Sequence, residues 1–152
     1  MDAYEHYIML KNLYKEDERR LKQNKKKPKR NPLREKVWMK YKKHCAYCGR
    51  EIEYKDMQID HMWPKCSGGN NNIINLMPSC RRCNHYKRAS NMNQFRILMR
   101  TLHERIGDIY IVKVAISYEL LTLKPFNGLF YFEEITGTRY EDIDLRDLIK
   151  TS

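Results

Sequence analysis

Residues 45–90 determine the fold, and they contain two Cys-x-x-Cys pairs, in CAYCG at 45–49 and CRRCN at 80–84. Two such pairs supply the four thiolates of a structural zinc site, and Gly49 permits the tight turn of a zinc knuckle. The four predicted zinc ligands are Cys45, Cys48, Cys80 and Cys83. Zinc would stabilise a region that is poor in long apolar runs.

Two other interpretations of the cysteines are less favoured. Disulfides need an oxidising compartment, and the first residues, MDAYEHYIML, lack the basic-then-apolar order of a signal peptide. A redox Cys-x-x-Cys would not need a second pair. We therefore expect a cytoplasmic protein with a structural zinc ion, in which the fifth cysteine, Cys66, has no assigned role.

The segment between the pairs, IDHMWPKCSGGNNNIINLMPSC at 59–80, carries the residue types of a phosphodiester-cleaving site. Asp60 and Asn84, which follows the fourth cysteine, offer oxygen ligands to a hard divalent cation. His61 is mostly neutral at physiological pH and could deprotonate a water molecule beside that cation. Each residue alone is a weak signal, but their order between and beside the cysteine pairs predicts hydrolysis of a phosphodiester.

This pattern resembles the HNH endonucleases, ββα-metal (His-Me finger) nucleases, in the subgroup with a four-cysteine zinc site. The resemblance covers CAYC, the segment at 59–80 and CNHYKR at 83–88. It implies that His61 is the general base, that Asp60 and Asn84 hold the catalytic metal, and that Asn75 holds the active-site loop and orients the base. Lys87 resembles a phosphate-contacting position.

The resemblance implies a small α+β fold, in which a ββα-metal core is built on the zinc site and flanked by helices. With asparagine as the last motif residue, the expected catalytic ion is Mg²⁺ or Mn²⁺. His85 is the alternative to Asn84, but a helical step of about 100° would turn it away from the site. DNA is the expected partner, with RNA less favoured. One site cuts one strand, so double-strand cleavage would require a homodimer or two successive nicks.

The charge of the chain also indicates a polyanionic partner. The 152 residues include 30 Lys and Arg against 19 Asp and Glu, a net charge of +11, and residues 1–50 alone have a net charge of +10. The candidate nucleic-acid contacts outside the catalytic residues are Arg81, Arg82, Lys87, Arg88, Lys25, Lys26, Lys27, Lys29 and Arg30. The run at 25–30 also fits a solvated linker, and neutralising it distinguishes the two interpretations.

We expect three segments: an N-terminal helix and basic arm at 1–32, the nuclease core at 33–90, and a C-terminal helical extension with a short strand at 91–152. Hydrophobic spacing predicts helices at 3–21, 91–107 and 108–123 and a strand at 129–134. Another helix is expected to start at Pro32, capped by Asn31, and to continue to residue 44. Its predicted inner face is Leu33, Val37, Trp38 and Tyr41.

Two competing functions remain to be weighed. A non-catalytic zinc-knuckle module that binds DNA or RNA would use the same basic residues, but it leaves Asp60, His61 and Asn84 unexplained. A zinc nucleobase deaminase needs His-x-Glu, whereas the sequence here is His61-Met62-Trp63. No stretch approaches the roughly 20 apolar residues of a membrane span. A metal-dependent endonuclease is therefore the leading hypothesis.

Overall fold

The computed structural model describes residues 31–141. The helix predicted at 3–21 and the basic residues Lys25, Lys26, Lys27, Lys29 and Arg30 lie outside this range. The chain divides into a unit of Met1–Asn31 and a unit of Pro32–Ser152, and the second is described below.

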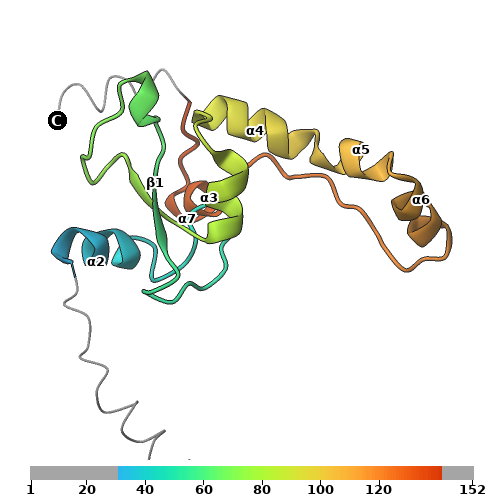
Figure 1. The fold of residues 1–152 in the computed structure, drawn as a ribbon, viewed down its shortest axis with the longest axis horizontal. Helices are drawn as coiled ribbons and strands as arrows, with labels where there is room; N and C mark the ends of the chain where they lie inside the picture. Colours follow the sequence, from blue (N-terminus) through green and yellow to red (C-terminus); the bar gives the residue numbers. More distant parts are fainter. Residues whose placement is uncertain (1–30, 142–152) are drawn as a thin grey trace, which may run out of the picture. The chain divides into compact units, whose positions relative to one another are not determined.

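A hairpin and a short helix form the centre of this unit (Figure 1). Strand β1 (Gln58–His61) pairs antiparallel with β2 (Leu76–Ser79), so that Gln58 lies opposite Ser79 and His61 opposite Leu76. Helix α3 (Arg81–Lys87) follows β2 directly. All four residues of β2 are buried. The predicted ββα unit and the small α+β fold are therefore confirmed.

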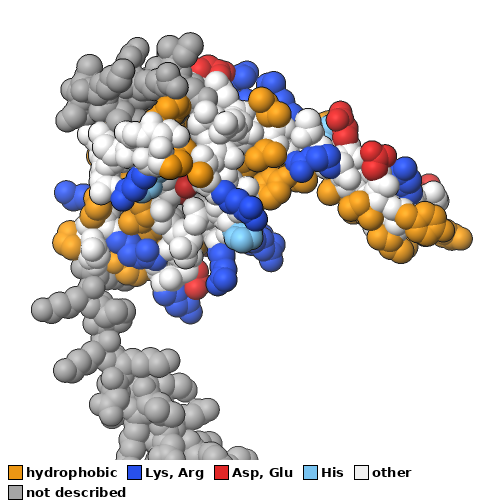
Figure 2. All heavy atoms as spheres, turned by 45° about the horizontal axis from the view of Figure 1, so that its top comes forward, with side chains coloured by type: hydrophobic (Ala, Val, Ile, Leu, Met, Phe, Trp, Pro, Cys, Tyr) orange, Lys and Arg blue, Asp and Glu red, His pale blue; other side chains and the backbone are white. Residues whose placement is uncertain are grey.

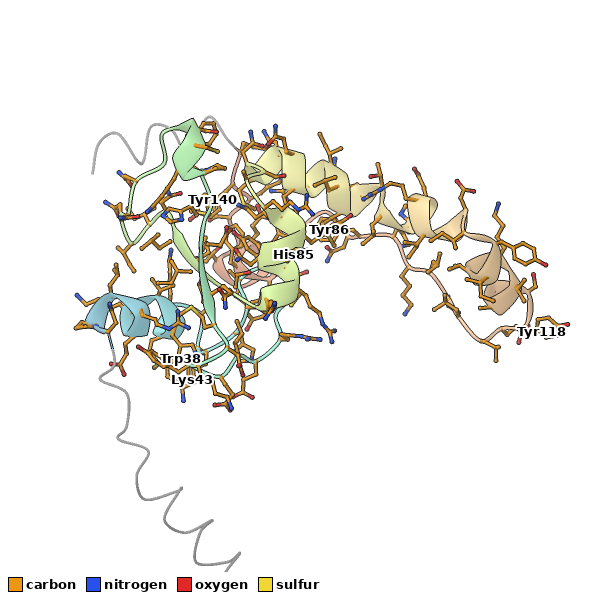
Figure 3. All side chains as sticks on the ribbon, viewed as in Figure 1. Trp38, Lys43, His85, Tyr86, Tyr118 and Tyr140 are labelled. Carbon is orange, nitrogen blue, oxygen red and sulfur yellow. The ribbon has the colours of Figure 1, made fainter. Side chains whose placement is uncertain are left out.

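Helix α2 (Pro32–Met39) is shorter than predicted. The chain leaves the helix through Lys42 and Lys43, whose φ angles of 51° and 67° are incompatible with a right-handed helix. Val37 and Trp38 are buried and Lys43 lies over the Trp38 ring (Figure 3), but Leu33 is 41% exposed, so its assignment to the inner face was wrong. The first turn of α2 extends beyond the core that its second turn covers.

The predicted helix at 91–107 is confirmed, although Thr101 divides it into α4 (Met92–Arg100) and α5 (Leu102–Gly107). A capping box between Asn91 and Gln94 starts α4. The helix expected at 108–123 is α6 (Tyr110–Ser117), which has no buried residue. Apolar side chains gather at this end of the unit (Figure 2). Among the described residues, no helix is both long and apolar enough to cross a bilayer.

The strand predicted at 129–134 was wrong, because α7 (Tyr131–Thr136) occupies this segment. The alternating burial of Phe130 and Phe132 resembles a strand, but the Glu133 carboxylate accepts a hydrogen bond from the Phe130 N–H at 2.9 Å and starts a helix there. Phe130 stacks on Phe95 with ring centroids 4.9 Å apart. Both rings also meet Tyr47 edge-on, at 5.3 and 5.6 Å. The C-terminal extension thus supplies aromatic rings that pack on Tyr47, between the cysteines of the first pair.

A buried ion pair fixes this extension. The Arg96 guanidinium donates to both carboxylate oxygens of Glu133, at 2.6 and 2.8 Å. The Glu133 carboxylate also accepts the N–H of Tyr140 at 2.9 Å. Burial opposes ionisation of Glu133, but the bonds from Arg96 and from the backbone lower its pKa below the usual value. The pair therefore joins α4 to α7 in its charged form.

Candidate metal centre and catalytic pocket

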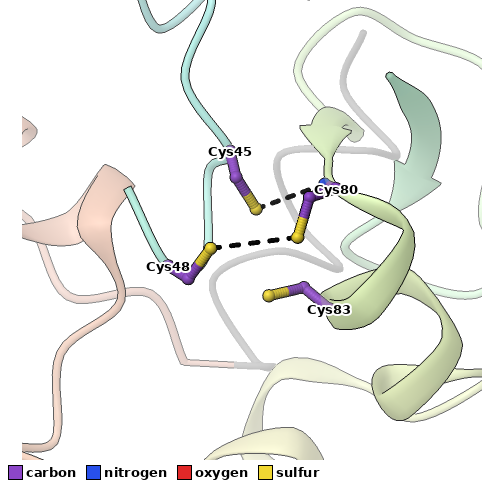
Figure 4. Close-up of side chains that lie close together, drawn as sticks. All are labelled: Cys45, Cys48, Cys80 and Cys83. Atoms are coloured by element: carbon purple, nitrogen blue, oxygen red, sulfur yellow. Dashed lines mark hydrogen bonds between the residues drawn. The ribbon is translucent and has the colours of Figure 1, made fainter. Parts of the chain in front are cut away.

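The four cysteines meet as predicted (Figure 4). Their sulfur atoms all lie within 4.8 Å of one another, and Cys48 Sγ is 3.9 Å from Cys80 Sγ. Tetrahedral zinc with Zn–S bonds of about 2.3 Å would separate its sulfurs by about 3.8 Å. Cys45 and Cys48 come from the knuckle, and Cys80 and Cys83 from the start of α3. The donor set and its spacing therefore fit a zinc site.

The knuckle holds its sulfurs by local backbone bonds. The Gly49 N–H donates to Cys45 O at 3.0 Å, and the Cys80 N–H donates to Cys45 Sγ at 3.3 Å. Hydrogen bonds with the Cys45 and Cys83 thiols lower the pKa of Cys48 to about 3, whereas the same cluster raises the pKa of Cys83. A lowered thiol pKa favours the thiolate, which is the form that binds a metal ion.

Asp60 is held from one side by two donors. Its Oδ2 atom is 3.0 Å from Lys87 Nζ and also accepts a hydrogen bond from the Tyr47 hydroxyl. Burial, followed by the charge of Asp60, raises the pKa of Tyr47 well above its usual value, so this hydroxyl stays protonated and donates. The carboxylate is 6% exposed and lines a cavity. The oxygen Oδ1 is therefore the one left for a cation.

The placement of Lys87 differs from the sequence expectation. Its side chain is fully buried, and its ammonium donates to His61 O at 2.8 Å in addition to pairing with Asp60. A buried ammonium needs such partners, because an unpaired charge away from water is strongly unfavourable. In this position Lys87 contacts the candidate catalytic residues Asp60 and His61 and is not available to a phosphate.

His61 and Asn75 lie at the two ends of the loop that joins β1 to β2. His61 Nε2 is 3.0 Å from Asn71 Oδ1. With that amide oxygen as the acceptor, Nε2 carries the proton and Nδ1 can accept one from water. Asn71 was not identified from the sequence, although it belongs to the run Asn70-Asn71-Asn72. The partner that orients His61 is thus Asn71, where Asn75 had been expected.

Asn75 holds the loop itself. Its side chain is fully buried, accepts from the Trp63 N–H at 2.8 Å and donates to Trp63 O at 3.1 Å and Asn70 O at 2.9 Å. These bonds satisfy buried backbone groups on both sides of the loop. The expected role of Asn75 in fixing the active-site loop is consistent with this geometry.

Asp60 and His61 line a cavity of about 290 Å³. The segment at 64–66 and the pair Arg88-Ala89 line it too. Lys65, which begins the short helix η1 (Lys65–Ser67), is therefore a cation beside the candidate catalytic residues, and the sequence analysis had not selected it. The cavity opens between the end of β1, η1 and the end of α3.

The remaining expected contacts lie along α3. Asn84 is half-buried, and among residues 31–141 no side-chain hydrogen bond joins it to Asp60 or His61. His85 is exposed on the same helix (Figure 3). Arg81 and Arg82 are exposed and line a second cavity of about 510 Å³ whose wall carries charges of both signs. The structure thus brings Lys87 into direct contact with Asp60 and His61. Asn84 lies one helical turn before Lys87 on α3 and is outside the Asp60–Lys87 ion pair.

Two comparisons with known protein sequences agree with this picture. The family model described as HNH endonuclease matches residues 45–97. CRISPR-associated endonuclease Cas9 from Actinomyces naeslundii is 46% identical over 44 residues, and the same-named protein from Corynebacterium diphtheriae is 41% identical over 44 residues. Each alignment covers 28% of this chain, which spans about 4% of the length of these relatives.

A solved structure also matches. The crystal structure of the Type II-C Cas9 enzyme from Actinomyces naeslundii aligns with 76% of this chain and 14% of that chain, at 20% identity and a TM-score of 0.42. The family assignment rests on the sequence match, which includes all four cysteines and the motif residues between them. The segment at 45–97 of this chain is therefore similar to the HNH endonuclease family.

Proposed function

We propose that the chain is a metal-dependent endonuclease that hydrolyses DNA phosphodiester bonds with His61 as general base. The observation that carries the proposal is the cavity in which His61 lies beside a carboxylate, Asp60, fixed by two buried donors. The HNH family match and the relatives named as endonucleases support this reaction class.

Each residue of the site has a separate role in the proposed hydrolysis. Asn71 holds the His61 ring with Nδ1 available, and His61 takes a proton from the attacking water. Asp60 Oδ1 and Asn84, on α3, would hold Mg²⁺ or Mn²⁺. When bound, that ion would stabilise negative charge on the phosphoryl and leaving oxygens. The expected products carry a 5′-phosphate and a 3′-hydroxyl group.

The structural ion has a separate role in the proposal. Zinc on the four cysteines would tie the knuckle to the start of α3, and thereby fix the helix that carries Asn84 and Lys87. Cleavage of both strands would then require a homodimer or two successive nicks. The exposed basic residues Arg81 and Arg82 would contact the DNA backbone, as would the arm at 25–30.

Nicking of supercoiled plasmid tests the proposal. The parent chain should cut with Mg²⁺ or Mn²⁺, and His61→Ala and Asn84→Ala should each lower the rate by about 100-fold or more. Zinc content and melting temperature should stay at the parent values in both variants. His85→Ala is the matched control on α3 and should cut normally. Equal, metal-independent cutting by the parent and His61→Ala would contradict the proposal in favour of a non-catalytic zinc-knuckle binding module.

A further inference from the structure

Arg88 occupies a backbone position that favours glycine. Its N–H donates to Asn84 O at 3.0 Å and completes α3, and the Ser90 N–H donates to Lys87 O at 3.0 Å to close a four-residue turn. Arg88 is the first central residue of this turn, with φ 51° and ψ −130°. These angles match a type II′ turn, in which glycine dominates at this position because a Cβ atom is strained there. Arginine thus occupies a position where glycine would suit the backbone better.

The side chain at this strained position lines the catalytic cavity. Lys65, Arg88, Asp60 and His61 all line the same space of about 290 Å³. Lys65 and Arg88 are exposed, and within residues 31–141 neither side-chain cation has an ion-pair or hydrogen-bond partner. The charge of Asp60 is already compensated by Lys87. The cavity therefore has two unneutralised positive charges at its rim, one from η1 and one from the residue that ends α3.

We propose that Lys65 and Arg88 together bind the DNA phosphate at the catalytic cavity. Arginine binds phosphate oxygens through two parallel N–H bonds, and lysine adds a point charge. The tight turn fixes the position of the Arg88 Cα atom beside the cavity, and this function explains why backbone strain is tolerated at this residue. The pair takes the role that the buried Lys87 cannot fill. This inference rests on the proposed function for the reaction, but its phosphate binding can be measured without cleavage.

The test measures binding of a short fluorescein-labelled DNA duplex by anisotropy across a KCl series, with the zinc-loaded chain and no added divalent cation. Each phosphate contact contributes about 0.9 to the slope of log affinity against log salt. Arg88→Gly and Lys65→Ala should each lower that slope by about 0.9 and weaken binding several-fold. Arg88→Lys, which keeps the charge, should keep most of the slope.

Lys42→Gly is the matched control. Lys42 is an exposed cation with a φ of 51°, as in Arg88, but it does not line the cavity. Both glycine variants remove one charge and one left-handed side chain, so both should raise the melting temperature, by about 2–6 °C. Only Arg88→Gly should lose DNA affinity. A variant that is more stable and yet binds DNA less well cannot be explained by damage to the fold.

The outcomes separate the two proposals. Unchanged salt slopes in Arg88→Gly and Lys65→Ala, or an equal loss in Lys42→Gly, would overturn phosphate binding at the cavity. A lower melting temperature in Arg88→Gly would overturn the assignment of strain. If the slopes fall as expected but the parent cuts no plasmid with Mg²⁺ or Mn²⁺, the phosphate site stands and the nuclease proposal fails.

Discussion

Replacing Lys87 by methionine retains most of the side-chain volume and removes the ammonium group that lies 3.0 Å from Asp60 Oδ2. Lys87 is fully buried and Asp60 is 6% exposed, so the variant leaves a carboxylate without its counter-ion. Removing one partner of a buried ion pair costs about 3–5 kcal/mol. Loss of the bond to His61 O adds about 1 kcal/mol. For a unit of this size the melting temperature should fall by about 15–30 °C.

Circular dichroism melts of the zinc-loaded chain would measure this change. The double variant Asp60→Asn with Lys87→Met should regain a large part of the lost stability, because no unpaired charge remains. Mn²⁺ should also stabilise Lys87→Met more than it stabilises the parent, since the cation would replace the missing charge. Tyr47→Phe removes only the hydroxyl and should cost about 1–2 kcal/mol. The reasoning would be refuted if Lys87→Met lost less than about 1 kcal/mol of unfolding free energy. It would also be refuted if the loss in the double variant equalled the sum of the losses in Asp60→Asn and Lys87→Met.

Three further substitutions test other parts of the structure. Asn75→Ala should destabilise the chain by about 2–4 kcal/mol and slow plasmid nicking, because three hydrogen bonds of the loop are lost. Urea unfolding measures the change, and Asn72→Ala, which is half-buried and loses the bond from the Ile74 N–H, is its control. Gly49→Ala should lower zinc affinity, measured by chelator competition, since the residue has a φ of 71° and its new Cβ would lie 2.7 Å from the Tyr131 ring. Glu133→Gln should cost about 3 kcal/mol at pH 7 by breaking the pair with Arg96. Because the pKa of Glu133 is lowered in the folded chain, the parent should lose this stabilisation as the pH falls below about 4.5, while the variant should not. Urea unfolding at several pH values would measure the difference. If the free energy of unfolding fell equally with pH in the parent and the variant, the assignment would be contradicted.

The sequence was sufficient for the parts of the site that are local in the chain. The cysteine spacing predicted the metal cluster, and the resemblance of the segment at 59–80 to the HNH endonucleases predicted the ββα unit in which Asp60 and His61 end β1. These features depend on backbone geometry within one hairpin and one helix. The long helical segments at 91–107 and 108–123 were predictable for the same reason, because their apolar spacing is repeated over several turns.

The parts that failed depend on contacts between distant segments. Nothing in the residues around Lys87 shows that α3 packs its side chain against Asp60, which is 27 positions away in the sequence. The helix at 131–136 is selected by the pair between Glu133 and Arg96, and local alternation of apolar residues indicated a strand instead. Asn71 was hidden among three consecutive asparagines, any of which could serve a turn.

The aromatic contacts of Tyr47 with Phe130 also set an order of events during synthesis. The two residues are 83 positions apart, and residues 126–133 lie beyond the segment that matches the HNH family model. At about 5–20 residues per second, a ribosome makes the whole catalytic motif several seconds before it makes the rings that pack beneath it. A chain that ends at residue 125 should therefore melt without cooperativity despite having every motif residue. We expect a nascent chain with the proposed activity to become competent to cut only after residues 126–133 have been made, which separates the presence of the motif from the presence of the activity.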